Sequence, residues 1–145
     1  TIPFKFQIIC SGIIVGLILL QTIIIAPTVF KVLKPSQTRD LLRGVFPKFF
    51  LIISIIGFIS VFIAFLFGIY HKIQTIVNVL TIVLALSCFF LIPATNNAKD
   101  VGNDKLFSLL HKISVYSTMV ILLVNLFWIC LAKNIMDKIF FEEKP

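Results

Sequence analysis

One histidine and a few polar side chains offer the clearest chemistry in this chain of 145 residues. His111 could ligate a metal or haem, transfer a proton, or hydrogen-bond a neighbouring carbonyl and so hold its helix in place. Ser114 follows three residues later and therefore shares one helix face with it. Asp100 could lie solvated in a connection or pair with His111. The other members of this candidate functional cluster are Asn96, Gln21 and Thr28.

A complete catalytic or metal site is not indicated. The second histidine, His71, is expected at the opposite membrane face, roughly 30 Å from His111. The three cysteines are scattered along the chain, and their spacing fits neither a disulfide framework nor a metal site. Glycine-rich phosphate loops, zinc signatures and basic–aromatic patterns for nucleic acid do not occur in the sequence. We therefore predict no catalytic residues, no metal ligand other than His111 if any, and no nucleic-acid partner.

Four long apolar runs must position these residues. The chain is 59% hydrophobic and only 13% charged. A hydrocarbon core about 30 Å thick requires about 20 apolar residues per helix. Runs of that length span residues 6–26, 49–70, 73–92 and 113–132, and none contains Asp, Glu, Lys or Arg. Backbone polar groups in lipid must be satisfied within the segment, so we predict an all-α integral membrane protein, an antiparallel four-helix bundle.

The whole chain, residues 1–145, is predicted to form one transmembrane domain. Its helices are expected at about residues 4–33, 36–70, 73–93 and 104–135. The first run is longer than the apolar region of a signal peptide and lacks a small-residue cleavage motif, so we expect it to be retained.

Helix boundaries are indicated by local signals. Pro35 should end the first helix, and Ser36 could cap the second, which we expect to kink near Pro47. Asn103 or Asp104 could cap the fourth helix.

The charge distribution predicts an orientation. The chain carries 13 Lys and Arg, and eight of them lie in the connections 31–48 and 94–112. Because cationic residues favour the cytoplasmic side, we expect both connections there and both termini on the other side of an inner or plasma-type membrane.

Small and polar residues recur at helical spacing in each run and predict helix–helix contacts. Gly12 and Gly16 form a GxxxG motif that could serve either the bundle itself or association with another chain. By the same pattern, His111 and Ser114 should face the bundle interior. The remaining packing residues are Ser54, Gly57, Ala64 and Gly68 in the second run, Asn78, Thr81, Ala85 and Cys88 in the third, and Thr118 and Asn125 in the fourth.

Four segments together resemble the transmembrane protein 205-like family, a domain of unknown function. They are Pro27-Thr28-Val29-Phe30, then residues 44–50, then residues 92–96 with Asp100 and Gly102, and finally Phe107, Leu110, His111 and Ser114 in order. The resemblance implies a four-helix membrane domain. The sequence is also distantly similar to copper-resistance protein D and HemJ-type membrane proteins, some of which are linked to copper or haem. HemJ-type proteins usually carry their histidine in the first helix, where this chain has none.

Two functional expectations follow. The first is a non-enzymatic accessory subunit or helix-packing partner that is embedded in lipid and contacts other transmembrane proteins or a second copy. The alternative is a haem- or copper-handling protein that uses His111 at the cytoplasmic end. A small transporter is less well supported, because the helix centres carry no charge. No cofactor is predicted for the first role.

Overall fold

Every regular element in the described part of the chain is a helix. The computed structural model describes residues 2–68 and 71–142. The elements are α1 (Ile2–Leu19), the π-helix η1 (Leu20–Ile25), α2 (Ala26–Val32), α3 (Pro35–Leu66), α4 (Lys72–Asp100) and α5 (Asp104–Glu142).

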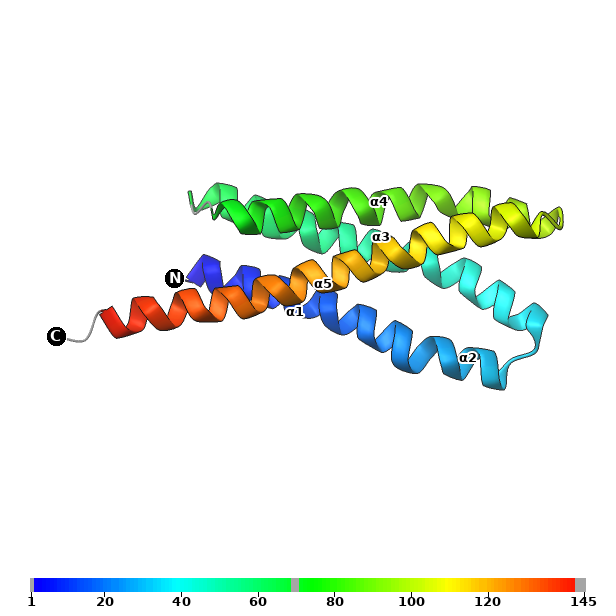
Figure 1. Cartoon of the computed structure of the whole chain (residues 1–145), viewed down its shortest axis with the longest axis horizontal. Coiled ribbons are helices and arrows are strands. Elements are labelled where there is room, and N and C mark those ends of the chain that lie inside the picture. The colour runs from blue at the N-terminus through cyan, green and yellow to red at the C-terminus, as the bar shows by residue number, and fades with distance from the viewer. Residues whose placement is uncertain (1, 69–70, 143–145) are drawn as a thin grey trace.

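These helices form the antiparallel bundle that the sequence predicts (Figure 1). α1 packs against α3 and α5, and α4 packs against the same two helices, so the four long helices close a ring of neighbours. Each has an inner face toward a common axis. Four helices in the described residues are long and apolar enough to cross a membrane, which confirms the predicted fold class.

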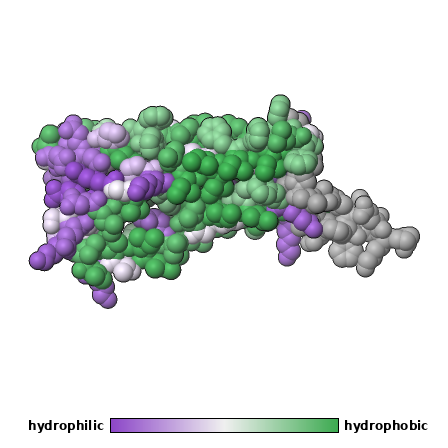
Figure 2. All heavy atoms as spheres, turned by 180° about the vertical axis from the view of Figure 1, so that it is seen from behind, coloured by the Kyte–Doolittle hydropathy of each residue, from purple (hydrophilic) through white to green (hydrophobic). Residues whose placement is uncertain are grey.

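The surface fits a lipid environment. Figure 2 shows a broad apolar band, with polar residues gathered mainly at the end that holds the α2–α3 and α4–α5 connections. Large side chains point outward within this band, among them Phe62, Phe90 and Leu123. Lipid tails can cover such side chains, whereas water would not favour so much exposed apolar surface.

The first span changes helix type part-way along its length. Pro27 has no N–H, and in a regular α-helix its ring would collide with the carbonyl four residues earlier. The chain widens into η1 just before it, where the Ala26 N–H donates to the Gln21 carbonyl five residues back. Beyond this point α2 contacts α3 but not α4 or α5, and Figure 1 shows it diverging from α5.

α3 begins one residue earlier than its predicted cap. Pro35 is the first helical residue, and the Lys34 N–H donates to Gln37 Oε1 at 3.2 Å. Ser36 is therefore not the cap, because proline at the first helical position already fixes the required φ. The helix continues through Pro47 and ends at Leu66. Residues 69 and 70, the end of the predicted 36–70 helix, lie outside the described residues.

α4 continues well beyond its predicted end at residue 93. Pro93 is exposed, and the helix passes through it to Asp100. Ala98 is buried against the bundle, so packing beyond the proline offsets the lost backbone bond.

Gly102 then turns the chain with φ at 71°, and the Asn103 N–H donates to the Ala98 carbonyl at 2.9 Å. This is a Schellman-type helix end. Asn103 Oδ1 accepts the Leu106 N–H at 3.1 Å, which caps α5 as the sequence suggested.

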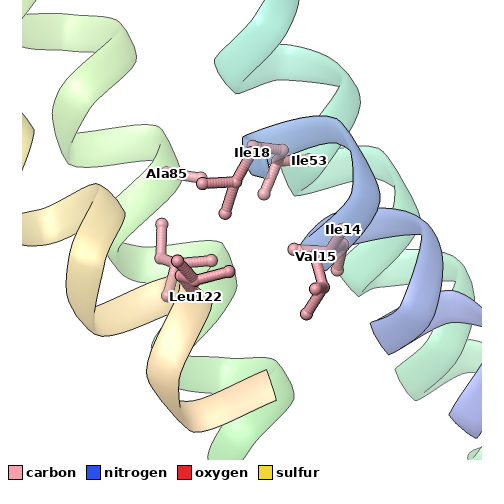
Figure 3. Packing of buried hydrophobic residues seen from close by; sticks show 7 residues of the cluster. Ile14, Val15, Ile18, Ile53, Ala85 and Leu122 are labelled. Carbon is pink, nitrogen blue, oxygen red and sulfur yellow. The ribbon is translucent and has the colours of Figure 1, made fainter. Parts of the chain in front are cut away.

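The apolar core joins all four spans. Its buried members are Ile14, Val15 and Ile18 of α1, Ile53 of α3, Ala85 of α4, and Ile121 and Leu122 of α5. Figure 3 shows these side chains meeting at the centre of the bundle. Between helices in lipid, such close packing acts through dispersion contacts rather than through exclusion of water.

The small residues play different parts in this packing. Gly57 and Ala64 are buried between helices, as their stripe predicts. Gly68 is instead exposed and turns the chain after α3 with φ at 63°. Its predicted packing role is wrong, because helix α3 ends before it and a left-handed turn favours glycine. Gly12 and Gly16 are exposed on α1.

We expect Gly57→Ala to destabilise the bundle by about 1–3 kcal/mol through overpacking. A Cβ atom at this position would lie 2.8 Å from Ile82 Cγ1 on α4. Unfolding of the purified chain in a mixed-micelle denaturant titration measures the change.

Gly44→Ala in the same helix is the matched control. No atom lies within 4 Å of its added Cβ, so the substitution should be neutral or stabilising by up to about 1 kcal/mol. Equal losses in the two variants would contradict a tight α3–α4 contact at Gly57.

Candidate functional site

The predicted functional cluster lies at the end of the bundle that holds the α2–α3 and α4–α5 connections, but it does not form one pocket. Thr28 is exposed on α2, which has no contact with α4 or α5. Asn96 on α4 and Ser114 on α5 are partly buried, and Asp100 is exposed at the end of α4. Gln21 is buried in η1. The π-helix and Pro27 turn α2 away from the other members, so Thr28 is separated from His111.

An ion pair between α3 and α4 organises this end. Arg43 Nη2 of α3 donates to Asp100 Oδ1 and, at 3.5 Å, to the Asn96 carbonyl. Asp100 therefore has Arg43 as its partner, not His111. Both side chains are partly open to solvent, at 32% and 47% exposure, and exposed pairs contribute little to stability. The pair fixes the register of two helix ends more than it strengthens the fold.

A second set of contacts links the α4 end to α5. Lys99 Nζ lies 3.5 Å from Asp104 Oδ1 and 4.8 Å from the centre of the Phe107 ring. The Phe107 ring stacks on His111, with ring centres 5.8 Å apart and planes inclined by 9°.

His111 itself is exposed, so the expectation that it faces the bundle interior is wrong. The buried face of α5 runs through Ile121, Asn125 and Trp128. At about 100° per residue, His111 lies roughly 80° away from Ile121 around the helix, whereas Ser114 lies nearly in line with it.

In the residues that the structure describes, no three His, Cys, Asp or Glu side chains lie close enough to hold a metal ion. A functional role for His111 stays a prediction.

The most concentrated polar chemistry lies inside the bundle, toward the start of α1. We name this set the buried polar core. Its members are at most 2% exposed: Gln7 and Ser11 of α1, Ser60 of α3, Gln74, Asn78 and Thr81 of α4, and Asn125 of α5. None carries a formal charge.

Direct hydrogen bonds within this core join neighbouring helices. Asn78 Nδ2 donates to Ser60 Oγ at 2.9 Å, which links α4 to α3. Asn125 Nδ2 donates to Thr81 Oγ1 at 2.9 Å, which links α5 to α4, and also to the Ile121 carbonyl at 2.9 Å. In lipid such bonds replace water as the partner of an amide, so they fix which faces of the helices meet.

An aromatic group lies at the outer end of the core. Trp128 is fully buried on α5. Phe4 meets it edge-on, with ring centres 5.7 Å apart, and His71 lies against it with ring centres 5.1 Å apart. Val77 and Ala132 complete the buried apolar contacts around the indole.

Sequence reasoning recognised part of this core and assigned it to packing. Asn78, Thr81 and Asn125 were expected in helix stripes, but Gln7, Gln74 and Trp128 were not grouped with them. The available signal is spacing: Gln7 and Ser11 are four residues apart, and Gln74 and Asn78 are also four apart. Polar residues at helical spacing within apolar runs share one face, which must turn away from lipid.

A protein-family model described as "Domain of unknown function (DUF4149)" matches residues 9–104, which cover most of α1 and all of η1, α2, α3 and α4. The chain belongs to this family. The DUF4149 match ends where α5 begins, so it includes Arg43 and Asp100 but not His111 or Trp128.

No curated protein and no solved structure matches the chain. The DUF4149 match confirms the expectation that the chain belongs to a domain family of unknown function. The closer resemblance to the transmembrane protein 205-like family, and the distant one to copper-resistance protein D and HemJ-type proteins, stay predictions.

We expect the Asn125–Thr81 bond to contribute a coupling energy of about 0.6–1.7 kcal/mol, the range for hydrogen bonds between membrane helices. A double-mutant cycle with Asn125→Leu and Thr81→Val, measured by denaturant titration in micelles, gives this term.

A parallel cycle pairs Asn125→Leu with Ser54→Ala. Ser54 donates to the Phe50 carbonyl of its own helix at 2.9 Å. Since the two side chains share no hydrogen bond, their effects should add within about 0.5 kcal/mol. Zero coupling in the Asn125–Thr81 cycle would show that this bond does not contribute to stability.

Proposed function

We propose that this chain is a non-enzymatic integral membrane protein that serves as an accessory subunit or helix-packing partner in a membrane assembly. One observation carries the proposal. Gly12 and Gly16 lie exposed on α1, and a Cβ atom at either position would have no atom within 4 Å. The bundle itself does not use its GxxxG motif.

Gly57 shows what a glycine used inside this bundle looks like. Its missing side chain lets α4 approach so closely that an added Cβ would collide with Ile82. Small residues in membrane helices allow this close approach between backbones. The same chemistry at Gly12 and Gly16, directed outward, suits the approach of a helix from another molecule.

The surroundings of the two glycines fit an apolar partner. Ile9 and Ile13 of α1, and Leu20 at the start of η1, are exposed near Gly12 and Gly16 on the same side of the first span. Their spacing is that of one helix face, and none of these residues is charged. The face therefore places larger apolar side chains beside the flat strip that the two glycines leave. The partner in this proposal is a transmembrane helix, either of a second copy or of another protein.

We expect Gly12→Leu combined with Gly16→Leu to abolish association while the bundle stays folded. Two leucines on this face would hold a partner helix away, yet the Cβ atom of each would have no atom of the chain's own bundle within 4 Å. Native mass measurement after gentle solubilisation reports the bound species, and helical content with thermal unfolding reports the fold.

Gly44→Leu is the matched control, because Gly44 is also an exposed helical glycine with open space around it. It should leave the assembly intact. An unmodified chain that is monomeric and free of co-purifying protein would sink the proposed role, as would a double variant that still associates.

A further inference from the structure

Several atoms of the buried polar core, and the indole nitrogen of Trp128 at its outer end, have no hydrogen-bond partner in the described part of the chain. They are Gln7 Oε1, Ser11 Oγ, both side-chain heteroatoms of Gln74, Asn125 Oδ1 and Trp128 Nε1. Their residues are at most 2% exposed. A buried polar group without a partner costs about 1–3 kcal/mol. Five such residues in one region would together oppose folding strongly, so these groups require a partner.

These groups lie at one level of the bundle. Trp128 and Val77 of α4 belong to one buried cluster, against which Phe4 and Ile8 of α1 pack. Gln7 lies between Phe4 and Ile8 in sequence, and Gln74 precedes Val77 by three residues, so both glutamines lie within about one helical turn of residues in the cluster around the indole. Asn125 precedes Trp128 by three residues on α5. Because all of them are buried in a closed ring of helices, they are directed toward the same interior.

The chemistry of the groups selects a neutral ligand with both donors and acceptors. Trp128 Nε1 and Gln74 Nε2 can only donate, whereas Gln7 Oε1, Gln74 Oε1 and Asn125 Oδ1 can only accept. The set contains neither a carboxylate nor a cationic side chain. A bound ion would therefore lack a counter-charge here, whereas water can donate and accept at once and typically makes about three hydrogen bonds when buried.

Apolar side chains close this interior on one side, and the imidazole ring of His71 lies at the other. One turn beyond Ser11 and Asn125 lie Ile14 and Leu122, which belong to the apolar core. At the other end His71 is only half-buried and lies against Trp128, and its Nδ1 is also unpartnered. Of the two ends, the one at His71 therefore offers a polar group to water, whereas the other ends at apolar side chains.

We infer that the buried polar core is a binding site for water, a closed-ended hydrated chamber reached from the membrane face at His71. Its water molecules bridge Gln7, Gln74, Asn125 and Trp128 and so tie α1, α4 and α5 together. This inference does not depend on the proposed association through Gly12 and Gly16.

The fluorescence of the unmodified chain tests the chamber directly, because Trp128 is the sole tryptophan. An indole N–H that is bonded to exchangeable water emits at longer wavelength than one in a dry apolar core, and its excited state lives longer in D₂O. We expect both signs for the full chain in lipid nanodiscs. A short-wavelength emission without an isotope effect would overturn the inference, and it would indicate that the side chains satisfy one another directly.

Variants locate the water. Gln7→Leu combined with Gln74→Leu should shift the emission to shorter wavelength and remove the isotope effect. Gln21→Leu is the matched control, because Gln21 is a buried glutamine of η1 on the far side of the apolar core; it should change neither signal. An isotope effect that persists in a folded double variant would overturn the inference. If the double variant does not fold, Gln74→Leu alone and the unmodified chain give the same test.

Discussion

An amide inside a bilayer has no water to bond with, and the bonds from Asn125 to Thr81 and from Asn78 to Ser60 answer that constraint across helix boundaries. Each requires that a particular face of one helix meet a particular face of the next. Apolar side chains can slide past one another in lipid at little cost, whereas these pairs cannot. The order α3–α4–α5 and its register depend on them, and the dispersion contacts around Ile14 and Ile53 fill the space that the pairs leave.

Close backbone approach serves the same end at Gly57. α3 and α4 meet where Ile82 lies over a residue without a side chain, about one turn from the Asn78–Ser60 bond. A tight contact and a directional bond therefore act at nearly the same depth. The Arg43–Asp100 pair holds the same two helices at their other end. α1 is held differently, by apolar contacts and by the burial of Gln7 and Ser11.

The sequence predicted the parts of this structure that depend on single segments. Four uncharged runs of membrane length imply four helices, and Asn103 carries the cap chemistry of the last one. It did not predict contacts that depend on how two helices rotate against each other. Arg43 and Asp100 are 57 residues apart, and nothing local indicates that they meet. His111 was predicted to face inward as part of a polar stripe, but the inward-facing stripe follows Ser114 and Asn125. Gln7, Gln74 and Trp128 come from three helices, so only the assembled bundle brings them together.

The π-helix divides the first span into two parts with different constraints. α1 lies between α3 and α5, whereas α2 rests on α3 alone. A helix that meets a thicker or thinner bilayer accommodates the mismatch by tilting or bending. In this chain such bending falls at η1, which follows the apolar core along the first span, because its wide turn already interrupts the regular α-helical hydrogen bonds. The first span can therefore follow local changes in membrane thickness with α2, while Gln7, Ser11 and their neighbours keep their positions.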